Sequence, residues 1–338
     1  AAVVSVPAIM PSRLPASMVS SGGKLAYFIR AMKIRSLFLG WLTAAALLGA
    51  AGARAESFPL PPAGESVIGE IHVLETRTAD TLSDIARAHH VGYDQIRLAN
   101  PAVDAWLPGE GTRVVVPTQH VLPDAPRAGL VLNLPEMRIY YFPPAKRGQP
   151  VTGLTFPVSI GRLDWRTPLG LTRVAAKVTN PEWRPPASIK AEHADEGDTL
   201  PDVFPPGPDN PLGQYALRLA REGYLIHGTN RPYGIGMRVT HGCIRLYPED
   251  IEQLFREVPV NAPVRIVDQP NKVGWRGGVL HLESHPPLEE NRAHDGNRLT
   301  PAVQAVIAAT RTRPARVNWD EVVRVATEAQ GLPVAISY

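Results

Sequence analysis

The sequence predicts a mostly β domain, sandwich-like or barrel-like with one main helix, joined to a small α+β module. The 338 residues include 35 Pro and 28 Gly, a composition that favours turns and short strands over long helices. Short apolar runs separated by turn residues fill 121–268, and a single helical pattern interrupts them. A β-α-α-β order is expected in 70–118. The length is sufficient for two domains.

The composition excludes some classes of protein. Hydrophobic residues make up 44% of the chain and charged residues 20%, which is ordinary for a globular protein. The formal net charge of +3 is spread along the chain without a block of Lys or Arg. We therefore expect no nucleic-acid partner.

The first 55 residues read as a targeting segment. Basic residues follow Met32, an apolar run of 15 residues fills 37–51, and Ala53 and Ala55 supply small residues at both positions that a signal peptidase reads. This pattern predicts a signal peptide at 32–55 and an exported protein. A membrane anchor is the alternative, but the run is short for a bilayer. We read 1–31 as a mis-set upstream extension, and we expect no transmembrane segment in the mature chain.

The small module, 70–118, is expected to begin and end with a strand. Leu82, Ile85 and Ala86 repeat at helical spacing after an N-cap at Asp80 or Thr81. The four expected elements, in order, are a strand at 71–74, a helix starting at 79–86, a second helix stopped by Pro101, and a strand at 112–117.

This order, with the DTLSDIA, ANP and VVVP segments, resembles a LysM module. The resemblance implies binding to glycans that contain N-acetylglucosamine. One departure is Ala79, where the pattern usually has Gly. The alternative is a degenerate module that only packs against its neighbour.

The larger domain, 121–268, is expected to start with a hairpin. Pro135-Glu136 lies between two apolar runs, which indicates its turn. The 181–213 segment reads as one long loop, and a loop of that length usually has a function. The expected strands are 130–134, 137–142, 154–160, 171–178, 215–219, 224–227 and 264–267, and the one helix is 248–258. The C-terminal extension, 271–338, suggests a strand pair and helices at 300–310 and 318–330, without a catalytic constellation.

Cys243 is the only cysteine in the chain. An unpaired thiol in an exported protein is worth flagging as reactive. Cysteine is a good nucleophile as the thiolate, and it needs a base and an orienting group. His227 and His241 bracket it, and Gly242 lets the backbone aim its N–H groups at a substrate. A buried packing role for Cys243, or zinc bound by these histidines and Cys243, remains open on chemistry alone.

The wider pattern narrows those alternatives. His227-Gly228-Thr229, followed by Thr240-His241-Gly242-Cys243-Ile244-Arg245, resembles the signature of the L,D-transpeptidase (YkuD) family. The resemblance spans roughly 128–267, and the TPLG turn and the helix after Arg245 support it. The order of signal peptide, LysM-like module and catalytic domain is similar to the periplasmic ErfK/YbiS type.

The resemblance implies specific roles. Cys243 is the nucleophile on peptidoglycan stem peptides and forms a thioester. His227 is the base, and the carbonyl of Gly228 orients its ring. The N–H groups of Gly242 and Cys243 hold the oxyanion. Arg245 binds a substrate carboxylate, with an ion pair within the fold as the alternative.

The remaining expectations concern the acceptor and the edges of the site. His241 and Thr240 shape the loop, and Tyr233 lines the cleft. The acceptor is another stem, a lysine of an outer-membrane lipoprotein, or water, which would make the enzyme a carboxypeptidase. A non-catalytic peptidoglycan-binding protein is the other alternative. No cofactor and no metal is implied, because the thiol supplies the nucleophile.

Overall fold

The computed structural model describes residues 56–145, 148, 150–292 and 299–338, all within one compact unit, Ala50–Tyr338. The expected signal peptide and the extension before it lie outside the described residues. Among the described residues, no helix is both long and apolar enough to cross a membrane.

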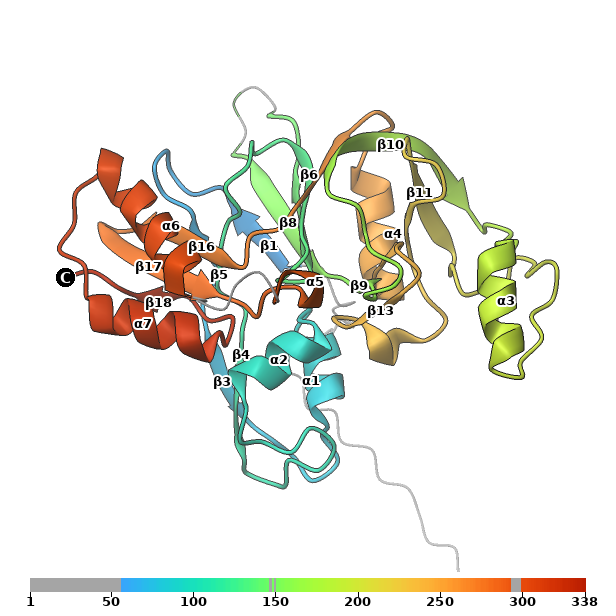
Figure 1. Cartoon of the computed structure of the whole chain (residues 1–338), viewed down its shortest axis with the longest axis horizontal. Helices are drawn as coiled ribbons and strands as arrows, with labels where there is room; N and C mark the ends of the chain where they lie inside the picture. Colours follow the sequence, from blue (N-terminus) through green and yellow to red (C-terminus); the bar gives the residue numbers. More distant parts are fainter. Residues whose placement is uncertain (1–55, 146–147, 149, 293–298) are drawn as a thin grey trace, which may run out of the picture. The chain divides into compact units, whose positions relative to one another are not determined.

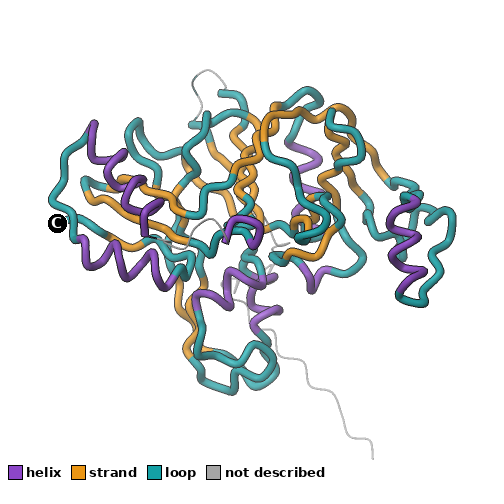
Figure 2. Tube along the Cα trace, viewed as in Figure 1, coloured by secondary structure: helices purple, strands orange, loops and turns teal. Residues whose placement is uncertain are grey.

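A nine-stranded sheet forms the large domain (Figures 1 and 2). Its hydrogen-bonded order is β1-β8-β7-β6-β15-β10-β11-β12-β14. In chain order the strands are β1 (Glu56–Pro59), β6 (Gly129–Asn133), β7 (Arg138–Phe142), β8 (Thr152–Pro157), β10 (Gly170–Thr179), β11 (Tyr215–Leu219), β12 (Leu225–His227), β14 (Ile244–Arg245) and β15 (Pro263–Val267). The expected hairpin is the antiparallel pair β6 and β7.

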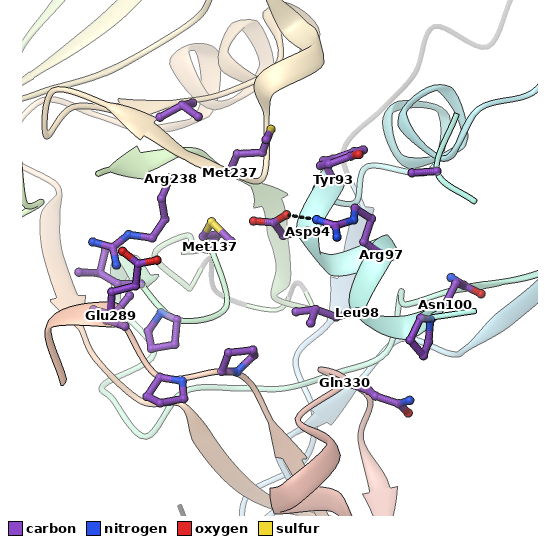
Figure 3. A pocket seen from close by; sticks show the side chains of 18 of the residues that line it. Tyr93, Asp94, Arg97, Leu98, Asn100, Met137, Met237, Arg238, Glu289 and Gln330 are labelled. Carbon is purple, nitrogen blue, oxygen red and sulfur yellow. Dashed lines mark ion pairs between the residues drawn. The ribbon is translucent and has the colours of Figure 1, made fainter. Parts of the chain in front are cut away.

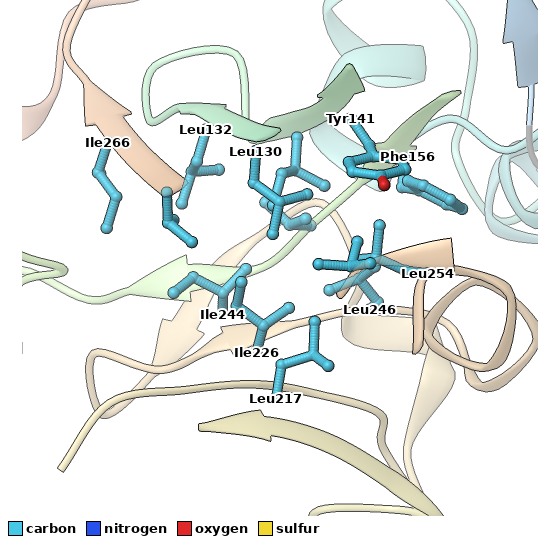
Figure 4. Packing of buried hydrophobic residues seen from close by; sticks show 14 of the residues in the cluster. Leu130, Leu132, Tyr141, Phe156, Leu217, Ile226, Ile244, Leu246, Leu254 and Ile266 are labelled. Atoms are coloured by element: carbon cyan, nitrogen blue, oxygen red, sulfur yellow. The ribbon is translucent and has the colours of Figure 1, made fainter. Parts of the chain in front are cut away.

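The sheet curls around a hydrophobic core. Leu130 and Ile266, from the β6 and β15 side, face Leu217 and Ile226, from the β11 and β12 side (Figure 4). Helix α4 (Pro248–Glu257) buries Ile251 and Leu254 in the same core. Each fully buried aliphatic side chain contributes roughly 1.5–3 kcal/mol. The mostly β prediction with one main helix is confirmed for this domain.

The last strand of the sheet, β14, contacts the segment that follows β8, the second strand in the sheet order. Arg245 in β14 exchanges two backbone hydrogen bonds with Ser159, at 2.8 and 3.0 Å. Because Ser159 follows β8, this bridge links the two ends of the curl. The same contact interrupts the expected strand 154–160, since Ile160 departs in β9 (Ile160–Gly161) to pair with β13 (Arg238–Thr240).

The expected loop at 181–213 contains a helix, α3 (Ala187–Asp195), so the prediction of a wholly irregular segment is wrong. Only Ile189 is buried in this helix, and it therefore lacks the apolar stripe that makes a helix visible in a sequence.

The small module has the expected β-α-α-β order. Strands β3 (His72–Glu75) and β4 (Arg113–Val116) pair antiparallel, and α1 (Leu82–Ala88) and α2 (Tyr93–Ala99) lie between them in the chain. Thr81 is the N-cap of α1, and its side chain accepts a hydrogen bond from the N–H of Asp84. A separate cluster that includes Leu82 and Ile96 forms its core.

The C-terminal extension forms a three-stranded sheet covered by two helices. The order is β16-β17-β18, and Leu280 and Leu282 pack with Val306 and Val322 from the helices. The elements are β16 (Asn271–Arg276), β17 (Val279–Ser284), β18 (Val334–Ala335), α6 (Leu299–Thr312) and α7 (Trp319–Glu328), with the short α5 (Glu289–Arg292) before α6. A further two-stranded ladder joins β2 (Val67–Ile68) and β5 (His120–Val121).

Candidate active site

Cys243 lies on a tight loop between β13 and β14. Gly242, the residue before it, has a φ of +95°, which favours glycine. A Cβ on Gly242 would lie 3.0 Å from the Tyr224 ring, so a larger residue is also crowded. The Thr240 hydroxyl donates to the Cys243 carbonyl at 2.6 Å, and the Thr167 hydroxyl donates to the Gly242 carbonyl at 2.9 Å. These two bonds fix the loop from both sides.

The thiol itself is partly buried. Its sulfur lies 3.7 Å from the carbonyl oxygen of Gly223, and the backbone of Leu225 also hydrogen-bonds to it. Burial raises the pKa of the Cys243 thiol above its usual range, although Leu225 and the charge of Arg245 oppose that shift. The resting group at neutral pH is therefore the neutral thiol, which needs a base to become a nucleophile.

His227 ends strand β12 beside that thiol. In the parallel pairing of β12 with β14, His227 lies opposite Arg245 and Ile226 lies opposite Ile244. Side chains directly opposite each other on paired strands share a face of the sheet, so His227 and Arg245 lie on the same face. Cys243 comes directly before β14, and this pairing therefore brings the thiol loop to the strand that carries the imidazole.

The imidazole is held in one orientation. His227 is only 3% exposed, and its Nδ1 lies 2.7 Å from the carbonyl oxygen of Gly228. Because a carbonyl only accepts, Nδ1 carries the proton and Nε2 keeps the lone pair, and the backbone of Leu212 also hydrogen-bonds to the ring. Burial, with the nearby charge of Arg245, lowers the pKa of His227 to about 3. The imidazole is therefore neutral in the substrate-free site, which is the protonation state that a general base needs before it accepts a proton.

Arg245 brings a positive charge to both groups. Its charge lowers the pKa of His227 and of Cys243, and burial lowers its own pKa. The Nε of Arg245 is buried and has no hydrogen-bond partner among the described residues. Arg231 adds a second positive charge near it. The site is therefore suited to a carboxylate.

His241 faces a different set of groups. Its Nε2 lies 3.1 Å from Glu192 in helix α3, and Trp165 packs edge-on against its ring at 5.1 Å between centroids. Arg162 also pairs with Glu192. We call Glu192, His241 and Arg162 the α3 clasp. It attaches the helix to the thiol loop.

Tyr233 is not brought to the thiol. It lies in the short 3-10 turn η1 (Pro232–Gly234), is 68% exposed, and its charge influences Arg87. Among the described residues, no contact joins Tyr233 to Cys243. Its role in lining the cleft stays a prediction.

Three residues of the site were not predicted from the sequence: Thr167, Glu192 and Arg162. Thr167 accepts a hydrogen bond from the N–H of Gly161 and donates to Gly242, but the sequence marks it only as part of a turn. Glu192 and Arg162 lie 49 and 79 positions from His241 in the chain. No local pattern could have linked them to the thiol.

A possible metal-binding set lies elsewhere. Single ligand atoms of His120, Glu136 and Glu283 lie within 4.8 Å of one another. The ammonium of Lys272 stands 2.7 Å from Glu136 and 2.9 Å from Glu283, and the Tyr140 hydroxyl also donates to Glu136. These donors already satisfy the carboxylates, so the set suits a structural ion pair better than a cation site.

A curled β domain that carries a thiol beside a neutral, anchored imidazole defines a candidate cysteine-dependent site. The model of the YkuD family, the L,D-transpeptidase catalytic domain, matches residues 127–266. The probable L,D-transpeptidase YcfS of Escherichia coli is 40% identical over 316 residues, covering 90% of this chain and 97% of the relative. The probable L,D-transpeptidase ErfK/SrfK of Salmonella typhimurium is 40% identical over 286 residues, covering 83% of this chain and 91% of the relative.

The chain therefore belongs to the L,D-transpeptidase family and is a transpeptidase enzyme. Among solved structures, L,D-transpeptidase 3 from Mycobacterium tuberculosis matches 61% of this chain and 93% of its own. Its identity is 18% and its TM-score is 0.30, values too low to add to the assignment.

Proposed function

We propose that this transpeptidase acts on peptidoglycan tetrapeptide stems through a thioester on Cys243. The observation that carries the proposal is the anchored neutral imidazole of His227, on the strand that pairs with the strand directly after the thiol. The sulfur attacks the carbonyl carbon of the third stem residue, and the terminal D-Ala leaves. An acceptor amine then releases the acyl group.

In this mechanism His227 accepts one proton and gives it back in each half of the reaction. Its Nε2 takes the proton of the Cys243 thiol as the carbon–sulfur bond forms. The same proton passes to the nitrogen of the departing D-Ala when the peptide bond breaks. In the second half, the acceptor amine loses a proton to Nε2 and the thiolate leaves. His227 returns that proton to sulfur, and the site is restored.

The negative oxygen of the tetrahedral intermediate needs donors. Neither the N–H of Gly242 nor that of Cys243 donates a hydrogen bond to any described residue, so both are free for this task. The left-handed backbone of Gly242 supports this arrangement. Donors fixed before the reaction stabilise a developing charge efficiently.

Arg245 is the proposed partner of a stem carboxylate. Its buried, unpaired Nε and the nearby Arg231 favour an anionic group at that position. Thr240 is proposed to hold the shape of the loop through its bond to the Cys243 carbonyl. His241 is proposed to shape the site without transferring protons.

The domain boundaries and location follow as proposals. We propose a LysM-like module at 70–118, a catalytic domain at 121–268 and a C-terminal extension at 271–338. Export to the periplasm by the segment at 32–55 suits a cell-wall substrate. The acceptor is a second stem or a lysine of an outer-membrane lipoprotein.

The test is mass spectrometry of the protein incubated with purified disaccharide-tetrapeptide, beside Cys243→Ala. We expect a dimer that lacks one D-Ala, formed only by the wild type. Tripeptide without dimer would favour a carboxypeptidase. If the wild type leaves tetrapeptide unchanged both alone and with a lipoprotein lysine peptide, the proposal is overturned.

A further inference from the structure

One turn of the small module contacts the chain on both sides of the thiol. The turn, 87–94, contains the end of α1 and the start of α2. The thiol segment, 235–250, begins before β13, passes through Cys243 and β14, and ends in the first turn of α4. The turn contacts this segment near each of its ends, and Cys243 lies between the two contacts.

The first contact lies before β13 and is made by backbone. The N–H groups of Tyr93 and Asp94, at the start of α2, donate to the carbonyls of Ile235 and Gly236, at 3.0 and 3.2 Å. Gly92 lies directly against Gly236, because a Cβ on Gly92 would lie 2.8 Å from the Cα of Gly236. The two chains therefore touch without a side chain between them, and neither can move far without the other.

The second contact lies in the first turn of α4 and is made by charged side chains. Arg87 donates two hydrogen bonds, of 2.8 and 3.0 Å, to the carboxylate of Glu249. The ring of His90 lies 2.7 Å from the buried carboxylate of Asp250. A guanidinium that binds a carboxylate through two bonds fixes direction as well as distance. The end of the thiol segment is therefore held to the same turn as its beginning.

The turn is itself anchored to the catalytic domain. His90 has a φ of +52°, a conformation that a residue with a side chain keeps only where its surroundings hold it. Its carbonyl accepts a hydrogen bond of 3.0 Å from the buried Arg138 in β7, which also donates to Gln95 in α2 at 3.1 Å. The hydroxyl of Tyr247 donates to the carbonyl of Val91 at 3.3 Å. The turn therefore connects the thiol segment to the large sheet.

Beyond the first contact, α2 and β13 line a cavity of about 920 Å³ (Figure 3). The rest of its lining comes from the β6–β7 turn at 134–137 and from residues within 286–292 and 328–330. Tyr93 and Asp94, from α2, lie at the same end of this cavity as Met237, directly before β13 (Figure 3). The remainder of α2 faces the cavity, so the contact with the thiol segment is concentrated in the turn.

We propose that the turn 87–94 positions Cys243 for the reaction, so that the small module contributes to the rate of transfer. The inference rests on the proposed function for its kinetic part. With both ends of the thiol segment fixed, the loop at Gly242 keeps the sulfur and the oxyanion donors in one arrangement. Misplacement by about 1 Å can cost about 10²-fold in rate, even when its origin is far from the chemistry. Arg87 and Gly92 touch no reacting atom and are positioning residues.

Gly92→Ala tests the first contact from the side of the module. Gly92 has a φ of −82°, which alanine also adopts, so the added methyl acts through its overlap with Gly236. In the whole, substrate-free protein, iodoacetamide should label Cys243 about threefold faster, because a loosened loop exposes a partly buried thiol. Gly234→Ala is the matched control, since its Cβ would meet only a methyl of Val239, at an ordinary 3.7 Å.

Arg87→Gln tests the second contact in the same way. Labelling should accelerate by about twofold, less than for Gly92→Ala, because this ion pair is partly exposed to solvent. The control is Arg77→Gln, since Arg77 is 90% exposed and pairs with Asp80 inside the module. All variants are compared far below the temperature of unfolding, so that unfolded molecules do not add to the rate. If Gly92→Ala labels no faster than the wild type, or Arg77→Gln accelerates labelling as much as Arg87→Gln, the proposal is overturned.

Kinetics on disaccharide-tetrapeptide then separate positioning from substrate binding. Gly92→Ala should lower kcat by about tenfold and leave KM within about twofold of the wild type. Gly234→Ala should keep both parameters. A rise in KM at unchanged kcat would mean that the module acts only by binding substrate, which overturns the positioning role. If the wild type transfers nothing, the proposed function fails, whereas labelling of the substrate-free protein still decides whether the turn positions the thiol.

Discussion

His227 and His241 look alike in the sequence and differ in the structure. Each precedes a glycine, and each belongs to the segment around Cys243. His227 is almost fully buried at the end of a strand, and its ring binds backbone groups of Gly228 and Leu212. His241 is partly exposed and binds side chains, Glu192 and Trp165.

The difference shows how a fold assigns separate tasks to equal groups. A buried imidazole with one nitrogen anchored to backbone keeps a fixed tautomer and remains neutral, which suits proton transfer. An imidazole paired with a carboxylate of α3, a short helix with little buried surface, suits attachment of that helix. The predictions below test this division.

The largest effect is expected from Cys243→Ala. Without the thiol there is no nucleophile for His227 to deprotonate, so transfer activity should fall by more than about 10⁴-fold. The side chain is small and partly exposed, so the free energy of unfolding should change by less than about 1 kcal/mol. Turnover of disaccharide-tetrapeptide and a calorimetric melt provide the two readouts. A variant that kept full turnover would remove Cys243 from the mechanism, and Cys243→Ser should also be very poor.

Replacing each histidine by glutamine is the most direct way to distinguish the role of His227 from the role of His241. His227→Gln should lower kcat by about 10²–10⁴-fold, the usual contribution of a general base. The matched change His241→Gln should affect kcat much less, because that ring points at Glu192. Steady-state kinetics on one substrate compares them. Equal losses in kcat would contradict the division.

The pH dependence of thiol alkylation sharpens the comparison. The pKa of His227 is lowered to about 3, so its ring stays neutral throughout the ordinary pH range. Burial raises the pKa of Cys243, so the thiolate forms only at a pH above the usual range of a cysteine thiol. Iodoacetamide labelling of the substrate-free enzyme should therefore accelerate only in the alkaline range, without a step near pH 6–7. Rapid labelling at pH 5 would indicate a thiolate–imidazolium pair instead.

The smallest effect is expected from Glu192→Gln. This change weakens the α3 clasp while it leaves the shape of the helix intact. Ion pairs of solvent-accessible side chains contribute little, because water screens the charges, so kcat/KM should change by less than about fivefold. The effect should fall on KM, because α3 borders the site rather than reacting. A loss in kcat as large as that of His227→Gln would mean that the clasp participates in catalysis. Lys190→Gln, on the same helix and paired with Asp202, is the control.

Local sequence patterns predicted much of the secondary structure and the thiol loop of this protein. Pro135-Glu136 predicted the β6–β7 hairpin, and the spacing of Ile251 and Leu254 predicted α4, because both signals lie within one element. The thiol loop was visible for a similar reason. Gly242 needs its left-handed backbone, and Cys243 is alone of its kind in the chain.

The contacts between segments that are distant in the chain were decided only by the tertiary structure. The parallel register that sets His227 opposite Arg245, the Ser159–Arg245 bridge that breaks one expected strand, and the clasp from Glu192 all join residues far apart in sequence. Helix α3 was missed because it has almost no buried face and so no periodic signal. Sequence by itself determines which side chains are available and what local geometry they favour. Only the closed core determines which of them meet, since burial and pairing energies depend on the whole fold.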